Sequence, residues 1–564
     1  MFGQNSLVGG GHRLATPAER GCIRTRTQFQ SQGMGKSTRG GGTFIGFPRM
    51  EVALESVTMH IKVALDNVFI LVEVTLKNVL DQAKVTLENV FVLCFRRQFD
   101  RLPRMQRKAT DISLRRKVDS LLNGWKSNPH RMPLVLKGAR QVGKTYSIRQ
   151  FARRNYQHFV EINFVERPEF KVIVRDGFSA SSIVRNITAI DATFIFETGT
   201  TLILFDEIQE FPEIATSLKF FAEDGRFDVI CSGSLLGVHY RRIASFSVGY
   251  QETSVMRSLD FEEFLFALGY RPEQLDEVLG FLVERKPFPE ALQTAFGRRF
   301  LEYCACGGMP EAVCCFVEDG TFTDVARIQK RLVLDYRADV RKYCENLDAA
   351  RIERVFDSVP AQLAKENKKF QYARIAKGAR RKDFWGCVEW LRDAGIVNVC
   401  QKMSFPELPV KGNVDADFYK LYMADSGILM AMMDDEARAD VLVRRNLGTW
   451  KGGFFENVVS EALVKAGAEP VYFKKDNSLL EMDFFLRSGD CLVPVEVKSE
   501  NGQGKSLRTM IGSPHYPDIR WGIKLVNGNI GFANGVLTIP QWCAFLLPRL
   551  AKEFANLPPL ADAR

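Results

Sequence analysis

The segment from residue 133 to residue 155 constrains the fold of this chain more than any other part. Residues 138–145 read GARQVGKT and match the pattern GxxxxGK[ST] at every fixed position. The apolar run before the motif predicts a buried strand, and residues 146–155 predict a helix. Gly138 and Gly143 would let backbone N–H groups close around a phosphate at the helix N-terminus. The segment therefore predicts a phosphate-binding loop at the edge of a parallel α/β sheet.

Side chains in and after this loop predict a site for ATP and Mg²⁺. We expect Lys144 to bridge the β- and γ-phosphates and the Thr145 hydroxyl to bind Mg²⁺. A second apolar run, residues 201–205, predicts a strand that ends in Asp206-Glu207. Asp206 would hold Mg²⁺ directly or through water, and Glu207 would polarise the attacking water. Lys144 and Glu207 are therefore the predicted catalytic residues, and hydrolysis is the expected chemistry.

A third predicted strand, residues 227–231, is followed by Ser232-Gly233-Ser234. Ser234 or Ser232 is a candidate for contact with the γ-phosphate, and a simple polar turn explains the sequence equally well. Three arginines are candidates for an arginine finger, and the sequence does not choose between them: Arg241, Arg242 and Arg257.

Residues 115–270 resemble a group of AAA-family ATPases from bacteria and archaea that carry a C-terminal domain of unknown function. The resemblance depends on the motifs GARQVGKTY, LILFDEIQE, SGSLLGV and LDFEEFLFALG, and it continues through CGGMPEAV, DYRADVRKY and SVPAQLAKENKKFQYARI. It covers roughly residues 107–510. The resemblance implies a P-loop ATPase of AAA type, without an established biological role. It also makes a homo-oligomer plausible, because such ATPases often place an arginine in a neighbour's site.

The middle of the chain predicts a helical segment and a winged helix. Residues 271–345 have a helical pattern, and residues 350–430 predict helices at 351–364, 371–378 and 381–393 before a β-hairpin. Positive charge gathers before and at the start of the third helix: Lys368, Lys369, Arg374, Lys377, Arg380, Arg381 and Lys382. DNA contact through this charge and a role as a protein-binding module both remain open.

Four residues near the C-terminus follow the order of the PD-(D/E)xK nucleases: Glu456, Asp483, Glu496 and Lys498. Glu496 and Lys498 are two residues apart, so on a strand they point to the same side. Asp483 and Glu496 would bind Mg²⁺ with support from Glu456, while Lys498 would orient the attacking water. The quartet predicts a restriction-endonuclease-like α/β domain at 445–545, and it leaves open whether that domain cleaves or only binds.

The predicted fold class is thus multidomain α/β: a P-loop domain at 107–270, a helical segment at 271–345, a winged helix at 350–430 and a nuclease-like domain at 445–545. The leading functional hypothesis is an ATP-hydrolysing, DNA-directed machine. The alternative is an ATP-dependent switch that acts through protein contacts and carries an inactive nuclease-like domain. A metabolic kinase is disfavoured, because Asp206-Glu207 suits activation of water.

The composition of the chain excludes some classes of protein, but it does not choose between the DNA-directed machine and the ATP-dependent switch. The net charge is +10, of which the first 110 residues carry +8, so the main body is nearly neutral. No apolar run reaches the roughly 18 residues of a membrane span, and no secretory signal is present, so we expect a cytoplasmic protein without a membrane anchor. Twelve scattered cysteines fit a reducing compartment. We interpret the tightest group as buried helical residues rather than as a metal site: Cys304, Cys306, Cys314 and Cys315.

Residues 1–104 lie before the region of resemblance. Residues 1–49 are rich in Gly, Ser and Arg and predict disorder. An 11-residue repeat follows, with copies that begin at Glu51, Lys62, Glu73 and Lys84. We interpret the repeat as an expanded DNA repeat translated upstream of the native start, for which Met105 is the candidate.

Overall fold

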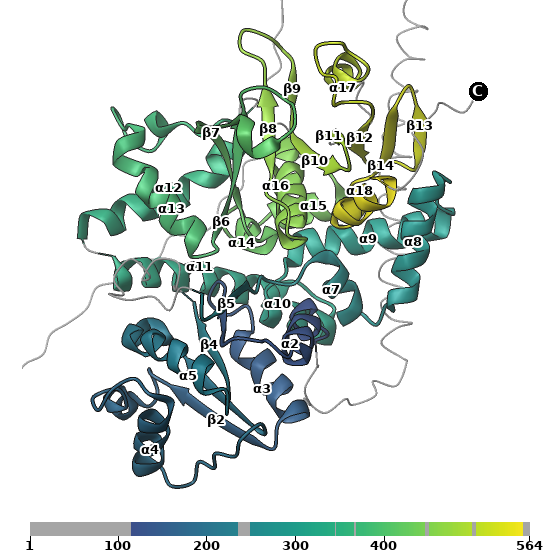
Figure 1. Ribbon diagram of the computed structural model, residues 1–564. Helices are drawn as coiled ribbons and strands as arrows, with labels where there is room; N and C mark the ends of the chain where they lie inside the picture. The colour runs from purple at the N-terminus through teal and green to yellow at the C-terminus, as the bar shows by residue number, and fades with distance from the viewer. Residues whose placement is uncertain are drawn as a thin grey trace, which may run out of the picture. The chain divides into compact units, whose positions relative to one another are not determined.

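The computed structural model describes residues 114–234, 249–344, 346–365, 368–445, 450–498 and 504–555. All of them belong to one compact unit, Asp111–Arg564 (Figure 1). The predictions for residues 1–104, for Met105 and for Arg241 and Arg242 fall outside the described residues. None of the helices in the described ranges combines the length and apolar character needed to cross a membrane.

A five-stranded parallel sheet carries the P-loop. Its strands are β1 (Leu134–Lys137), β2 (His158–Asn163), β3 (Thr201–Asp206), β4 (Asp228–Gly233) and β5 (Glu252–Val255). Their order is β2-β3-β4-β1-β5, so β4 separates the P-loop strand from the strand that ends in Asp206. This sheet confirms the predicted P-loop α/β fold for this part of the chain.

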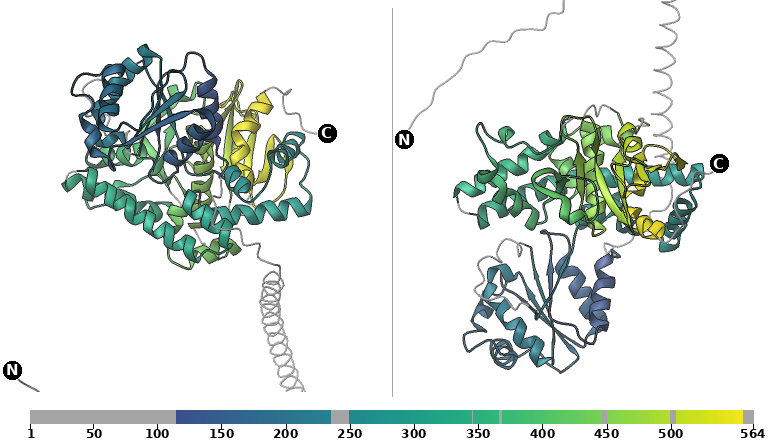
Figure 2. Two further views of the ribbon diagram at one scale, coloured as in Figure 1. Left: turned by 90° about the horizontal axis from the view of Figure 1, so that it is seen from below. Right: turned by 45° about the horizontal axis from the view of Figure 1, so that its top comes forward.

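Helices cover both faces of this sheet because its strands are apolar on both sides (Figures 1 and 2). Along β1, Leu134 and Leu136 join one buried cluster, and Val135 joins another. The first cluster includes α2 (Lys117–Ser127) and α3 (Lys144–Asn155). The second includes α4 (Ala180–Ile190) and α5 (Leu218–Asp224). All strands run parallel, so their carboxyl ends meet at one edge, where the predicted site residues lie.

The predicted helical segment, 271–345, forms as α8 (Pro272–Glu284), α9 (Glu290–Cys306), α10 (Pro310–Asp319) and α11 (Thr323–Tyr343). Before it, α7 (Phe261–Ala267) lies within the predicted P-loop domain. After it, α12 (Asn346–Leu363) forms where the first helix of the winged-helix region is predicted, at 351–364. The four clustered cysteines lie on α9 and α10, where Cys304 and Cys306 are fully buried. Within the described ranges, no group of three or more His, Cys, Asp or Glu residues is arranged to hold a metal ion.

The predicted helix at 371–378 is wrong, because only a short 3-10 turn forms there, at Tyr372–Arg374. Just before the turn the chain is held beside β7 (Val414–Met423), where the Phe370 N–H donates to the Tyr419 carbonyl at 2.9 Å. The Phe370 ring also stacks on Tyr419, with ring centroids 5.3 Å apart. These tertiary contacts fix an extended backbone that local propensity does not predict.

The third predicted helix of this region forms as α13 (Arg381–Asp393), and the ribbon forms as β6 (Val397–Met403) paired antiparallel with β7. The ribbon continues into a four-stranded sheet with the order β7-β6-β8-β9, which adds β8 (Val471–Lys474) and β9 (Glu481–Met482). One sheet therefore takes strands from both sides of the boundary predicted between 430 and 445.

A second C-terminal sheet has the order β10-β11-β12-β14-β13. Its strands are β10 (Phe484–Ser488), β11 (Cys491–Val497), β12 (Gly522–Val526), β13 (Gly531–Ala533) and β14 (Val536–Pro540). The helices around the two sheets are α14 (Ser426–Ala431), α15 (Ala437–Val443), α16 (Trp450–Lys465), α17 (Lys505–Met510) and α18 (Leu547–Ala555). Asp483 lies between β9 and β10, where the chain passes from one sheet to the other.

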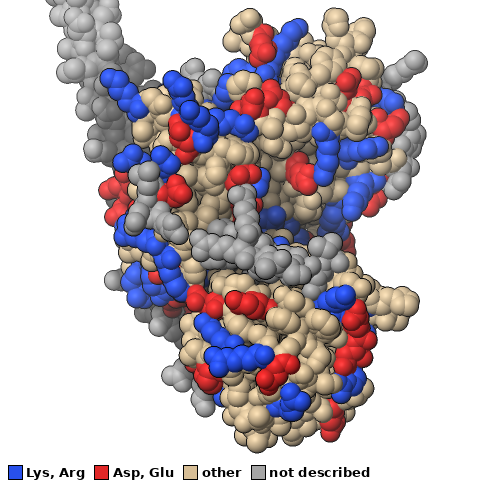
Figure 3. Space-filling view, turned by 60° about the vertical axis from the view of Figure 1, so that its left-hand side comes forward, with Lys and Arg blue, Asp and Glu red and all other residues tan. Residues whose placement is uncertain are grey.

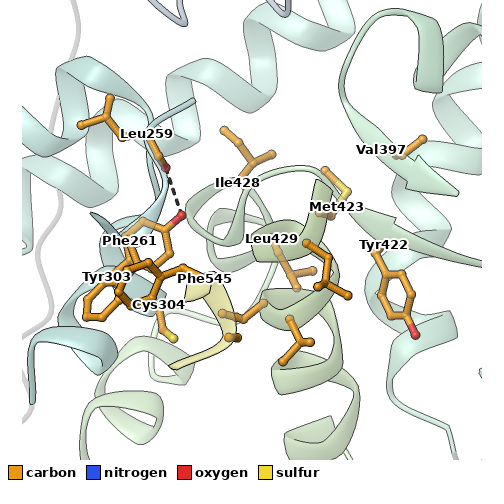
Figure 4. Packing of buried hydrophobic residues seen from close by; sticks show 14 of the residues in the cluster. Leu259, Phe261, Tyr303, Cys304, Val397, Tyr422, Met423, Ile428, Leu429 and Phe545 are labelled. Atoms are coloured by element: carbon orange, nitrogen blue, oxygen red, sulfur yellow. Dashed lines mark hydrogen bonds between the residues drawn. The ribbon is translucent and has the colours of Figure 1, made fainter. Parts of the chain in front are cut away.

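The hydrophobic core continues across these elements (Figure 4). Phe261 of α7 packs against Tyr303 of α9 and against Phe545, with ring centroids 5.5 Å and 5.3 Å apart. The Tyr303 hydroxyl donates to the Leu259 carbonyl at 3.0 Å, as the dashed line in Figure 4 shows. Aromatic burial of this kind makes the P-loop domain and the C-terminal helices parts of one packed unit.

Two adjacent glycines of α16 give a test of this packing. A Cβ on Gly453 would lie 2.1 Å from the Leu363 carbonyl oxygen, whereas a Cβ on Gly452 would meet nothing closer than Lys368 Nζ at 3.8 Å. We expect Gly453→Ala to lower the free energy of unfolding by about 1–3 kcal/mol through overpacking. Gly452→Ala should raise it by up to about 1 kcal/mol, because alanine favours the helix. Thermal and urea unfolding would measure both changes, and equal effects of the two substitutions would contradict the packing.

Candidate functional site

Two glycines give the P-loop its shape. Gly138 has a φ of +155°, and a Cβ there would lie 2.1 Å from the Met256 carbonyl oxygen. Gly143 has a φ of +94° and directly precedes α3. Residues that carry a Cβ rarely adopt such backbone angles, so both positions favour glycine. The buried Lys144 ammonium donates to the carbonyls of Gly138 and Ala139, at 2.9 Å each.

Asp206 collects polar groups from several elements. Its Oδ2 atom accepts hydrogen bonds from Thr145 Oγ1 at 3.0 Å and from Asn163 Nδ2 at 3.2 Å. Its Oδ1 atom accepts from the Ser232 hydroxyl. The hydroxyl and the carboxylate proposed to share Mg²⁺ therefore lie within hydrogen-bond distance, and oxygen ligands of this kind fit that ion.

The structure distinguishes the two serines after β4. Ser232 lies within β4 and contacts Asp206, whereas Ser234 is buried one residue beyond the end of the strand. Ser232 is thus the serine that the fold brings to the predicted metal ligand. Asn163, at the end of β2, was not singled out in the sequence, although a polar residue that ends an apolar strand is a usable signal.

Glu207 follows β3 and has a positive φ of 53°, which is uncommon for a residue with a side chain. Its Oε2 atom accepts a hydrogen bond from the Gln209 amide. Burial raises the pKa of Glu207, and the neighbouring Asp206 adds to this shift, against the opposing effects of Gln209, Lys144 and Arg140. A raised pKa makes a carboxylate a better proton acceptor, as a residue that polarises water requires.

Helix α11 packs against the P-loop. Arg140 forms an ion pair with Asp339, and Gln141 Nε2 donates to Asp335 at 2.9 Å. The Tyr336 hydroxyl donates to the Arg140 carbonyl at 3.4 Å. All three α11 residues belong to the stretch DYRADVRKY, and no sequence spacing could have linked them to a loop almost two hundred residues earlier.

A cavity of about 270 Å³ lies beside the P-loop. P-loop residues and the end of β5 form one wall, and the other wall comes from later in the chain, including Tyr336, Gly395, Asp425 and Lys465. Arg257 also lines the cavity, and no carboxylate among the described residues forms an ion pair with it. Burial lowers the pKa of Arg257. Of the three candidate arginines, it is the one that the described residues place beside the P-loop.

In the C-terminal part, a buried lysine lies among carboxylates. Lys420 Nζ is 2.9 Å from Glu481 Oε1, 3.5 Å from Glu456 Oε2 and 3.6 Å from Asp483 Oδ1. None of these contacts has the directional geometry of a hydrogen bond donated by Lys420. A second lysine, Lys368, forms an ion pair with Glu456. Sequence reasoning missed Lys420 and Glu481 because neither belongs to the nuclease pattern.

The four predicted nuclease residues lie near one another: burial lowers the pKa of Lys498, but Glu496, Asp483 and Glu456 together raise it above its usual value. Glu456 and Asp483 both contact Lys420, while Glu496 forms an ion pair with Lys498 at 2.6 Å. Asp483 Oδ2 also accepts from the Val497 N–H at 2.9 Å, which brings it beside β11. Burial and the neighbouring Glu456 raise the pKa of Asp483, against the opposing effects of Lys420 and Lys368.

This arrangement does not fit a resident divalent cation. Mg²⁺ needs near-octahedral oxygen ligands and usually keeps several waters. Here the ammonium of Lys420 supplies positive charge to three carboxylates and is only 1% exposed. A divalent ion beside it would be opposed by the charge of a fixed lysine within a few ångströms.

Comparisons with known proteins match three successive segments of the chain. A family profile described as an AAA domain matches residues 130–265. Profiles for a domain of unknown function (DUF8612) and another (DUF4143) match residues 297–439 and 451–542. None of the curated proteins matches the chain.

Two of the solved structures that are similar to this chain match more than half of its length. The Walker-type ATPase PABY2304 of Pyrococcus abyssi is 14% identical, with a TM-score of 0.36, and the match covers 57% of this chain and 95% of that one. The ADP form of the Aeropyrum pernix ORC2 protein is 10% identical, with a TM-score of 0.25 and coverage of 60% and 97%. TM-scores of this size do not support an assignment of fold or function to this chain. The family match and the P-loop geometry together identify residues 130–265 as a P-loop domain of AAA type.

The buried Lys144 predicts a proton linkage of nucleotide binding. Burial lowers the pKa of Lys144 to about 8, although Glu207 and Asp206 oppose the shift. Bound phosphates would favour the charged ammonium, so ATP binding should take up a proton above pH 8 and weaken by up to about tenfold per pH unit there. Below pH 7 Lys144 is already charged, and this uptake should vanish. Calorimetry at pH 7 and pH 9 in buffers of different ionisation enthalpy would measure the uptake.

Lys144→Arg is the matched control, because arginine stays charged throughout this range. If this variant takes up as many protons at pH 9 as the parent does, Lys144 is not their source.

Proposed function

We propose that this chain binds ATP with Mg²⁺ at residues 138–145 and hydrolyses it. The observation that carries the proposal is the contact of Thr145 on α3 with Asp206 on β3, across the mouth of the P-loop. Lys144 would hold the β- and γ-phosphates, and Thr145 and Asp206 would hold the metal. When bound, Mg²⁺ neutralises phosphate charge. Glu207 would orient and polarise the attacking water.

The order of the strands supports a direction for the nucleotide along the sheet edge. Asp206 ends β3 and Glu207 follows it, on one side of β1, so the γ-phosphate would point that way. The nucleoside end would then point toward β5 on the other side. The cavity lined by Gly138 and Arg257 lies on that side, so we propose that it holds the base and the ribose.

Glu207→Gln tests the hydrolytic role. Loss of a general base should lower kcat by about 10²–10⁴-fold while ATP binding is kept. Phosphate release and binding of a fluorescent ATP analogue would separate the two effects. Glu210→Gln is a suitable control, because Glu210 contacts Lys342 and Tyr343 on α11 rather than the P-loop. Wild-type turnover by Glu207→Gln would exclude the role given to this residue.

We further propose that the ATPase acts as a switch that passes its nucleotide state to the C-terminal part. Asp425 supports this coupling, because its carboxylate accepts from the Ser258 hydroxyl at 2.7 Å and from the Gly308 N–H at 2.9 Å. Ser258 follows β5 and lines the proposed nucleoside cavity. Lys465 at the end of α16 lies 3.5 Å from the same carboxylate. A change at the cavity would therefore act on α16, which also carries Glu456.

The position of Lys420 favours the alternative in which the nuclease-like domain does not cleave. The Lys420 ammonium lies among Glu456, Glu481 and Asp483 and supplies the positive charge that a catalytic metal ion would otherwise supply. In this proposal the C-terminal domain and the winged-helix region serve binding and coupling. DNA as the partner and a homo-oligomeric assembly stay predictions.

A cleavage assay tests this choice. We expect no Mg²⁺-dependent cutting of single- or double-stranded DNA by the parent protein, with or without ATP, and the same result for Lys498→Ala. Gel electrophoresis of labelled DNA would show the products. Cleavage by the parent that disappears in Lys498→Ala would instead establish a DNA-cleaving enzyme.

A further inference from the structure

An open groove lies at the edge of the sheet β7-β6-β8-β9. Its volume is about 580 Å³, and four lysines but only one acidic residue line it. We call it the lysine groove, and its lining residues are Lys369, Lys402, Phe418, Tyr472, Lys474, Lys475, Asp476, Asn477, Ser478 and Leu479. These residues come from the segment before the 3-10 turn at Tyr372–Arg374, from both strands of the ribbon, from β8 and from the β8–β9 turn, so only the folded sheet brings them together.

The groove holds like charges close together. Lys402 pairs with Asp476 at 2.9 Å, and Lys474 pairs with Glu481 at 2.8 Å. Lys475 is exposed, and no carboxylate in the described parts of the chain pairs with it. Burial lowers the pKa of Lys369, and the neighbouring Lys402 adds to this shift, against the opposing effects of Asp476 and Asp415. The groove therefore keeps an excess of positive charge that an anionic ligand would relieve.

Apolar groups lie among these cations. The ammonium of Lys369 lies 3.5 Å from the centroid of the Phe418 ring, and that of Lys402 lies 5.2 Å from it. Leu479, on the turn between β8 and β9, is 99% exposed. Cations that follow a phosphate backbone, together with aromatic and apolar groups that contact bases, are typical of surfaces for single-stranded nucleic acid.

Two of the seven basic residues before and at the start of α13 form ion pairs within the fold. Arg381 pairs with Asp417 at 2.8 Å and donates to the Ala416 carbonyl at 3.0 Å. Lys368 is turned inward to Glu456. On the face in Figure 3, Lys and Arg side chains occur over both the upper and the lower part, with Asp and Glu among them.

Lys377, Arg380 and Lys382 remain exposed, and no carboxylate among the described residues pairs with them, so the start of α13 is a second basic surface. The lysine groove differs from it in being a hollow that combines lysines with Phe418 and the exposed Leu479.

We propose that the lysine groove binds the backbone of a single-stranded nucleic acid. A rigid duplex would meet the projecting β8–β9 turn, whereas a flexible strand can follow the sheet edge past Phe418 and Leu479. An acidic peptide would satisfy the charge but would leave Phe418 without a base to stack on and Leu479 without an apolar contact. The inference deepens the proposed function by naming the partner of the switch. Binding of a strand needs no ATP hydrolysis, so the two proposals fail separately.

The test uses the full chain and a fluorescent oligo-dT of about 20 nucleotides, a length sufficient for one or two binding sites. Anisotropy titrations at several salt concentrations would give the affinity and its salt dependence. Lys369→Ala with Lys475→Ala should weaken binding several-fold and reduce the slope of log Kobs against log salt by about 1.4, or 0.7 for each lost phosphate contact. Phe418→Ala should weaken binding with little change in the slope.

Lys219→Ala with Lys286→Ala removes the same charge from α5 and from the segment just after α8, and it should bind like the parent. Melting temperatures would show that all variants are folded. Lys144→Ala should bind the oligonucleotide normally although it lacks ATPase activity. Unchanged affinity and slope in the Lys369/Lys475 variant would overturn the proposal, as would equal losses in the control pair. Tighter binding of duplex DNA, or displacement of the strand by polyglutamate at equal charge, would also overturn it.

Discussion

The buried carboxylate of Asp425 accepts hydrogen bonds that connect the end of the P-loop domain, the loop after α9 and the start of α14. Its Oδ1 atom accepts from the Gly427 and Ile428 N–H groups at the start of α14, while its Oδ2 atom accepts from Ser258 and Gly308. Charge-assisted hydrogen bonds of this kind contribute about 1.5–3 kcal/mol each. With Lys465 at 3.5 Å, one buried carboxylate joins residues from all three segments that match separate families.

Close packing around Asp425 explains two glycines of the stretch CGGMPEAV. A Cβ on Gly307 would lie 2.3 Å from Asp425 Oδ1, and a Cβ on Gly308 would lie 1.8 Å from the Leu259 carbonyl oxygen. The same loop thus touches both the end of the P-loop domain and α14. The P-loop itself packs against Met256, two residues before Ser258, so only a short stretch of chain separates the P-loop from the contacts of Asp425. This proximity supports a switch more directly than the domain order does.

The Lys420 cluster consists of Lys420, Glu456, Glu481 and Asp483. Two of these residues match a catalytic pattern in the sequence, but their contacts in the fold differ from those that the pattern predicts. Glu456 and Asp483 come together, as the nuclease pattern predicts, but a lysine from β7 lies between them. A buried ion cluster of this kind is costly unless every charge has a partner, and Lys368 and Tyr422 supply two further contacts to Glu456. Sequence order alone could not reveal this, since Lys420 precedes the pattern and belongs to a different sheet.

The parts of the site that depend on residues adjacent in the chain could be predicted from the sequence. The P-loop, the Asp206-Glu207 pair and the parallel sheet follow from residues adjacent in the chain, because a glycine loop between a strand and a helix depends on local backbone geometry. Tertiary structure alone decided which serine meets Asp206, that residues 371–378 would not form a helix, and that α11 would hold the P-loop. It also decided that Lys420 would lie among the carboxylates and that four lysines would share one groove. Each of these depends on contacts between distant residues, whose burial and charge outweigh local preference.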